Sequence, residues 1–157
     1  MTNFVMIATT HTLTGLAIGS QVENIPAIII LGILSHFVLD ALPHLDEEEI
    51  EQKYSRKVAL IIASFDILVS VLILLLAIYK LNRVPALNLV VGALAGNFID
   101  LIDNVPGIKG YLKKLPVFKQ IHFIHGVVQR PGKRYRFVLG IPIQFIIIGL
   151  SIYLIVK

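Results

Sequence analysis

The sequence contains no cysteine, and charged residues make up only 15% of its 157 residues. The lack of cysteine excludes disulfide bonds and thiolate metal sites, and it is neutral about the redox compartment. Globular proteins carry roughly 25% charged residues, whereas this chain is 56% hydrophobic with a mean hydropathy of +0.83. A soluble domain of this length could not bury so many long apolar runs, so the composition points to a lipid bilayer.

Five apolar segments meet or approach the length of about 20 residues that a membrane-spanning helix needs. They are residues 4–20, 25–42, 58–79, 84–103 and 137–156. The expected fold is therefore all-α, a polytopic membrane helical bundle with about five transmembrane helices in a single integral membrane domain over residues 1–157. The first segment lacks a basic start, and the Thr9-Thr10-His11-Thr12 stretch interrupts it, so it is not expected to be a signal peptide.

The basic residues indicate an orientation in the membrane. If all five segments span, one face carries eleven lysines and arginines, most of them in a basic loop over residues 104–136, and the other face carries three (Lys80, Arg83 and Lys157). The positive-inside rule then makes the first face cytoplasmic, with the N-terminus inside, in a multi-pass protein of the cytoplasmic (inner) membrane. Since the basic residues lie beside apolar helices, the net charge of +4 does not indicate a nucleic-acid partner. Within the loop, residues 115–125 are expected to form a short amphipathic, interfacial helix.

Ionisable side chains interrupt the apolar segments at one level. At about 1.5 Å of rise per residue, the intramembrane aspartates and all five histidines fall in the cytoplasmic half of the expected bilayer. His36 and Asp40 are four residues apart and share one helix face. Imidazole and carboxylate groups suit Zn²⁺, Mn²⁺ or Fe, and a bound ion would offset the cost of burying the carboxylates. The pattern therefore predicts a divalent metal site, most simply zinc, with one or two ions.

Simpler interpretations of the same residues stay open. His36 with Asp40 could be a helix-stabilising pair, Asp66 could hydrogen-bond a neighbouring helix, and Asp103 could cap a helix end. His122 and His125 could contact lipid headgroups, and His44 lies beyond a proline, so its direction is uncertain. Four glycines, Gly15, Gly19, Gly92 and Gly96, are interpreted as helix-packing positions.

Three motifs resemble the membrane-bound metal-dependent hydrolase family, the YdjM-like group. They are His11-Thr-Leu-Thr-Gly15, Ser35-His36-Phe-Val-Leu-Asp40-Ala-Leu-Pro43-His44-Leu-Asp46 and Gly96-Asn-Phe-Ile-Asp100. His125-Gly-Val-Val-Gln129 is similar to a late His-x-x-x-Gln element of some such proteins. Many relatives have a Pro-Asp-x-Asp-His cluster where this chain has Ile99-Asp100-Leu-Ile-Asp103-Asn104, which lacks the histidine of a second metal. The resemblance implies a small multi-helical membrane hydrolase that depends on a metal.

The resulting expectation is a membrane-embedded metal-dependent hydrolase that acts, through a metal-activated water, on a lipid or phospholipid-like ester or phosphoester at the cytoplasmic leaflet. The expected metal ligands are His11, His36, Asp40, Asp66, Asp100, His122 and His125. Asp103 and His44 are the expected catalytic groups, and the basic residues Lys113, Lys114, Arg130 and Arg134 are expected to bind an anionic headgroup. Membrane lipids are the expected partners, and the sequence does not indicate an oligomeric state. An ion- or proton-coupled transporter and a non-catalytic membrane protein with a structural metal are the alternatives.

Overall fold

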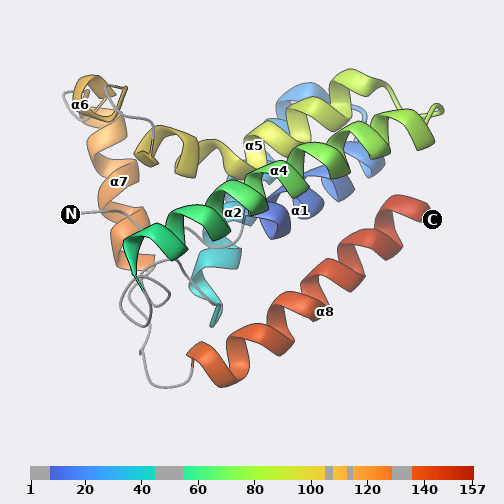
Figure 1. Cartoon of the computed structure of the whole chain (residues 1–157). Coiled ribbons are helices and arrows are strands. Elements are labelled where there is room, and N and C mark those ends of the chain that lie inside the picture. The colour runs from blue at the N-terminus through green and yellow to red at the C-terminus, as the bar shows by residue number, and fades with distance from the viewer. Residues whose placement is uncertain (1–7, 45–54, 105–107, 113–114, 129–135) are drawn as a thin grey trace.

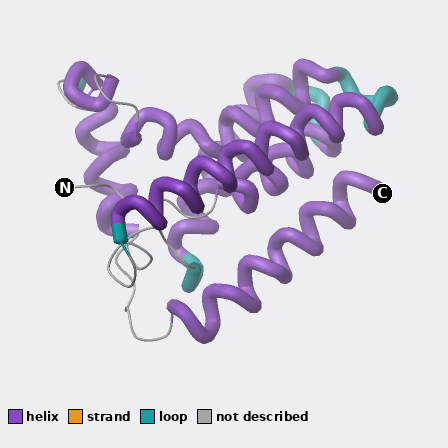
Figure 2. Tube along the Cα trace, in the orientation of Figure 1, coloured by secondary structure: helices purple, strands orange, loops and turns teal. Residues whose placement is uncertain are grey.

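The computed structural model describes residues 8–44, 55–104, 108–112, 115–128 and 136–157. This part of the chain forms seven α-helices and no strand (Figure 1, Figure 2). The helices are α1 (Ala8–Gln21), α2 (Ile25–Ala41), α4 (Arg56–Lys80), α5 (Ala86–Asn104), α6 (Ile108–Leu112), α7 (Pro116–Val128) and α8 (Arg136–Val156). The expectation of an all-α fold is confirmed.

Local sequence explains where several helices begin and end. The Asn24 side chain accepts a hydrogen bond from the Ala27 backbone N–H and so caps the start of α2, with Pro26 in its first turn. The same helix ends at Ala41, because Leu42 is extended before Pro43. Ser55 caps α4 in the same way through the Val58 N–H. These signals place the described helix ends within two or three residues of the expected ones, except at the start of α1, where residues 4–7 lie outside the described residues.

The expected count of five transmembrane helices is corrected to two in the described part of the chain. Only α4 and residues Leu139–Val156 of α8 are both long and apolar enough to cross a membrane. The apolar parts of α2 and α5 are shorter, because an extended residue before a proline ends α2, and α1 has only 14 residues, many of them threonine or glycine. The segment 104–136, expected as a loop with one short helix, contains both α6 and α7, and α7 matches the predicted interfacial helix.

Helix α1 lies at the centre of the bundle, where it packs against α2, α4, α5 and α8. Its closest neighbour is α5, since a Cβ added to Gly15 would overlap the Gly92 carbonyl oxygen and one added to Gly92 would overlap that of Gly15. Gly19 and Gly96 approach the opposite backbone at Asn88 and His11 in the same way. The prediction that these four glycines are helix-packing positions is confirmed.

The pairing of the glycines fixes the direction of the helices. Residues 11, 15 and 19 of α1 face residues 96, 92 and 88 of α5, so the two helices are antiparallel. Gly32 of α2 lies against Ala95 and Gly96, and His36 reaches Gly96, so α2 runs in the same direction as α5. The start of α1 and the ends of α2 and α5 therefore meet at one end of the molecule, and α6 and α7 lie at that end (Figure 1).

Candidate metal centre

Five of the predicted ligands come together where these helix ends meet. His11 comes from α1, His36 and Asp40 from α2, Asp100 from α5 and His125 from α7. All five are buried. Two overlapping groups, His11 with His36 and Asp40, and His36 with Asp100 and His125, each offer three ligand atoms within 4.8 Å of one another.

Asp40 is the carboxylate around which the histidines gather. Its Oδ2 lies 2.8 Å from His125 Nε2 and 3.1 Å from His36 Nε2, and its Oδ1 lies 3.4 Å from His11 Nε2. Asp100 is farther out, with carboxylate oxygens 3.7 Å, 3.9 Å and 4.0 Å from the Nε2 atoms of His36, His125 and His11. The imidazole rings of His11 and His36 are stacked at 4.2 Å between centroids. All three histidines therefore direct Nε2 toward the two carboxylates.

A backbone carbonyl fixes the orientation of the His36 ring on the side away from the carboxylates. Its Nδ1 lies 2.8 Å from the Gly96 carbonyl oxygen, an acceptor only, so Nδ1 carries a hydrogen and Nε2 is the ring nitrogen that faces the carboxylates. Metal-binding histidines are held in this way, with the second ring nitrogen donating to a carbonyl or carboxylate. This carbonyl is a contribution that the sequence interpretation missed. Gly96 was assigned to helix packing alone, although it begins the motif that ends at Asp100.

Two buried atoms at the centre of the cluster lack hydrogen bonds to any described residue. They are His11 Nε2 and Asp40 Oδ1, which lie 3.4 Å apart, and His11 Nδ1 also has no hydrogen-bond partner. A buried polar atom without a partner costs about 1–3 kcal/mol. A cation between the two facing atoms would bind both of them and so replace the missing hydrogen bonds. The donor set and these atoms fit a divalent ion, whose two positive charges would balance the two carboxylates.

His44, an expected catalytic group, is buried beside this cluster. Its Nδ1 lies 2.8 Å from the Leu42 carbonyl oxygen, so Nδ1 donates and Nε2 can carry a lone pair. It follows Asp40 by four residues, just beyond the end of α2. His44 belongs to neither of the two ligand groups. Its position therefore suits a residue that lies beside the metal centre and does not bind the metal.

Two expected ligands lie outside both groups. The Asp66 carboxylate bonds to Thr9 at the start of α1, and the half-buried His122 is one turn of α7 away from His125. Asp66 therefore contacts the start of α1, and His122 is a neighbour of the cluster member His125 along α7. The boundaries of an apolar segment predict a residue's position along a helix and not its rotation about the helix axis, so the sequence alone did not separate these two residues from the five that cluster.

The remaining predicted site residues cannot be placed. Asp103 lies in the last turn of α5, but its side chain is outside the described part of the structure, and Lys113, Lys114, Arg130 and Arg134 lie outside the described residues altogether. A further neighbour was not foreseen. The Phe37 ring contacts His36 and His125 edge-on, at 6.0 Å and 6.3 Å between centroids, and so adds an apolar wall to the histidine cluster.

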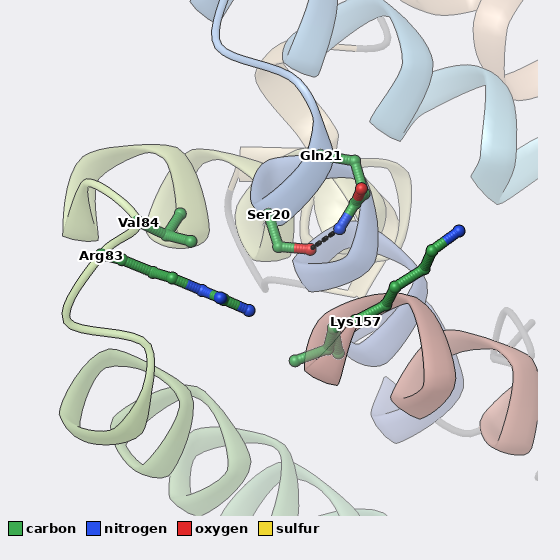
Figure 3. A pocket seen from close by; sticks show the side chains of 6 residues that line it. Ser20, Gln21, Arg83, Val84 and Lys157 are labelled. Carbon is green, nitrogen blue, oxygen red and sulfur yellow. Dashed lines mark hydrogen bonds between the residues drawn. The ribbon is translucent and has the colours of Figure 1, made fainter.

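A pocket of about 300 Å³ lies at the other end of α1, far from the histidines. It is lined by Ser20, Gln21, Arg83, Val84, Ile155 and Lys157 (Figure 3). The Gln21 side-chain amide donates to Ser20 Oγ across 3.5 Å at its edge. Its lining includes two cations and no histidine or carboxylate, so the pocket has none of the ligands that the cluster offers to a metal.

Comparisons with known proteins do not extend this description. No family model matches the chain, and no curated protein or solved structure matches it either. The site is therefore defined by its own residues, a buried cluster of three histidines and two aspartates drawn from four helices.

Proposed function

We propose that this protein is a membrane-embedded metal-dependent hydrolase of the cytoplasmic membrane that acts on an ester or phosphoester of a membrane lipid. The observation that carries the proposal is the buried cluster of five residues, His11, His36, Asp40, Asp100 and His125. Within it His11 Nε2 and Asp40 Oδ1 face one another without a hydrogen bond to any described residue. The metal is supported by this geometry, and the hydrolytic reaction by the resemblance of the motifs to the membrane-bound metal-dependent hydrolases.

Membrane association is supported by the outer faces of the helices. The rest of the described chain buries only 11% of the apolar window in α4 and 17% of that in α8. Leucine, isoleucine and phenylalanine side chains such as Phe65, Leu75 and Phe145 are more than half exposed. A core helix of a soluble protein would be covered on most sides, whereas these faces suit contact with lipid tails.

The ligands favour a borderline or hard divalent cation. Three imidazoles with two carboxylates suit Zn²⁺, and Mn²⁺ and Fe²⁺ accept the same donors. His36 belongs to both ligand groups, so the residues would hold either one ion at their centre or two neighbouring ions. When bound, such an ion supplies a Lewis acid and lowers the pKa of a coordinated water.

The chain's own residues supply the rest of the proposed site. Buried His44 offers an Nε2 lone pair beside the cluster for accepting a proton, and Asp103, in the last turn of α5, is the second candidate base. The basic residues of the proposed cytoplasmic face, among them Lys113, Lys114, Arg130 and Arg134, would hold the anionic headgroup. If the end of the bundle at which α6 and α7 lie faces the cytoplasm, a site there would meet lipid from the inner leaflet.

The metal is tested first. Protein purified in detergent without chelator is expected to carry zinc, manganese or iron, and His36→Ala to carry much less. Ser151→Ala is the matched control, because Ser151 is buried and bonded to Thr14 at a distance from the cluster. Equal, near-zero metal content in all three proteins would reject the metal centre.

Hydrolysis is tested with the metal-loaded protein in vesicles of anionic phospholipid. We expect metal-dependent release of a lipid product from the wild-type protein, and loss of that release in His36→Ala. Metal binding without turnover of any phospholipid ester would instead favour a structural metal. Metal or proton flux across liposomes that requires the cluster would favour a transporter.

A further inference from the structure

Asp66 is an ionisable residue in the middle of an apolar helix, and it lies outside the ligand cluster. Its neighbours Phe65 and Ile67 are more than half exposed, as expected for a helix face in contact with lipid. A carboxylate at such a position is costly unless it has partners within the protein. The partners of Asp66 therefore indicate what this side chain does.

Those partners lie at the first turn of α1. Both carboxylate oxygens of Asp66 are 3.3 Å from the Thr9 backbone nitrogen, and the Thr9 hydroxyl donates a hydrogen bond to Oδ1. Ser70 Oγ, one turn farther along α4, is 3.2 Å from the same hydroxyl. The first N–H groups of a helix have no partner within the helix, and a carboxylate there also complements the helix dipole. Asp66 thus acts as an N-terminal cap that α4 supplies to α1.

The capped turn carries a member of the cluster. His11 is two residues beyond Thr9 and is completely buried. In contrast to His36, whose Nδ1 is held by the Gly96 carbonyl, neither ring nitrogen of His11 has a hydrogen bond to a described residue. The stacking on His36 and the backbone of α1 therefore determine where His11 Nε2 lies.

The first turn of α1 is fixed from two sides. On one side Asp66 of α4 holds Thr9, and on the other the Asn97 side-chain amide of α5 donates to Thr12 Oγ1 across 2.9 Å. His11 lies between these two contacts along the chain. Loss of the cap would leave the Thr9 N–H without the Asp66 carboxylate, while the Thr9 hydroxyl would keep its contact with Ser70.

We propose that Asp66 is a positioning residue of the metal centre, which caps α1 from α4 and thereby sets the position of His11. This inference rests on the metal centre proposed above. It departs from a ligand role for Asp66, because the carboxylate reaches the centre only through the backbone of α1.

The experiment measures Co²⁺ affinity and the Co²⁺ absorption spectrum of the full-length protein in detergent. Asp66→Ala removes the cap and is expected to raise the dissociation constant about tenfold, the lower end of the effect of outer-shell partners, with the spectrum and the number of bound ions unchanged. Asp66→Asn keeps an oxygen that accepts from Thr9 and is expected to stay near wild type. Ser64→Ala, at an exposed position two residues away in α4, is the matched control.

Each other result has a definite meaning. An unchanged dissociation constant in Asp66→Ala, even with reduced thermal stability, would overturn the positioning role, because a purely structural contact would lower stability alone. A changed spectrum or a lost ion in both Asp66 variants would overturn it in favour of direct coordination. Absence of Co²⁺ binding to wild-type protein would reject the metal centre itself.

A second variant tests the proposal if Asp66→Ala does not fold. Thr9→Ala removes only the hydroxyl and is expected to raise the dissociation constant for Co²⁺ about threefold. An unchanged dissociation constant in Thr9→Ala would count against the proposal.

Discussion

Asp40 makes the shortest contacts of the cluster, to His125 and His36 through one oxygen, and it faces His11 through the other. All of these side chains are buried. The three imidazoles therefore surround the carboxylate of Asp40. Asp100 stands farther from all three rings, and its closest approach is 3.7 Å.

At the residue scale, Asp40→Asn is expected to weaken metal binding more than a change at the periphery. The amide keeps the size of the side chain but loses its negative charge, and it can present a donor where the cluster needs an acceptor. The loss of Zn²⁺ affinity should exceed the roughly 10–100-fold effect of substituting residues that only contact the ligands. Isothermal titration calorimetry with Zn²⁺ measures the dissociation constant of the variant and the wild type. A variant that binds Zn²⁺ as tightly as wild type would show that Asp40 is not a ligand.

Much of the site was predictable from single residues, and the missing part has a physical cause. His11, His36, Asp40 and Asp100 lie near the ends of their apolar segments that the sequence assigns to one face, and His125 lies in the helix expected beside that face. Rotation about the helix axis depends on which helices are neighbours, and nothing in the local sequence states this. The sequence therefore could not show that Asp66 faces Thr9, or which of His122 and His125 joins the cluster.

The contact between α1 and α5 rests on glycine at matched positions. Gly15 and Gly92 bring the two backbones so close that neither position has room for a methyl group. The other two glycines of the contact are four residues farther along each helix, so the small side chains form one stripe on each surface. This close approach places His11 beside Gly96 and aligns the ends of both helices that carry the site.

At the element scale, Gly92→Ala is expected to lower the free energy of unfolding of the protein in detergent by about 1–3 kcal/mol, the usual cost of overpacking. The added Cβ meets backbone atoms of Gly15, which cannot rotate away. Gly149→Ala in α8 is the control, because nothing lies within 4 Å of the added carbon, and it should be neutral or slightly stabilising. Circular dichroism at 222 nm follows unfolding. Equal midpoints for the two variants would contradict the close helix contact.

The sequence predicted the ends of a helix correctly where the residues that start or stop the helix lie at that end. The Asn24 and Ser55 caps and the Leu42-Pro43 stop are visible in the sequence, and each helix begins or ends there. The number of spans was overestimated because apolar runs slightly shorter than a full span were counted as spans, as in α2 and α5. Helix α1 is the clearest case, since its threonines and histidine serve contacts within the bundle.

The ligands connect α7 with helices that it otherwise contacts little. Among the described residues α7 packs chiefly on α2, and its buried His125 reaches Asp40 of that helix and Asp100 of α5. Its other face exposes Val117, Phe123 and Val127, as expected for a helix that lies in the membrane interface. A bound ion would therefore link α1, α2, α5 and α7 at one point.

At the scale of the whole molecule, metal removal is expected to destabilise the fold. A ligand that binds only the folded state adds about 2.7 kcal/mol when present at 100 times its dissociation constant. The unfolding midpoint of the wild-type protein should fall when a chelator is added and rise again as Zn²⁺ is added back. The unfolding midpoint of Asp40→Asn should change neither with chelator nor with Zn²⁺. A wild-type midpoint that is insensitive to chelator would show that the four helices hold together without an ion.

The threonines of α1 also bear on how the protein is made. Thr9, Thr12 and Thr14 find their partners Asp66, Asn97 and Ser151 on three different helices, which follow 57, 85 and 137 residues later in the chain. Within this chain α1 is translated before all three partners, so its polar side chains and glycine stripe wait without them. These contacts are complete only when α8 has also been made, because Ser151 belongs to α8. Among the described helices α1 thus precedes every helix that encloses it.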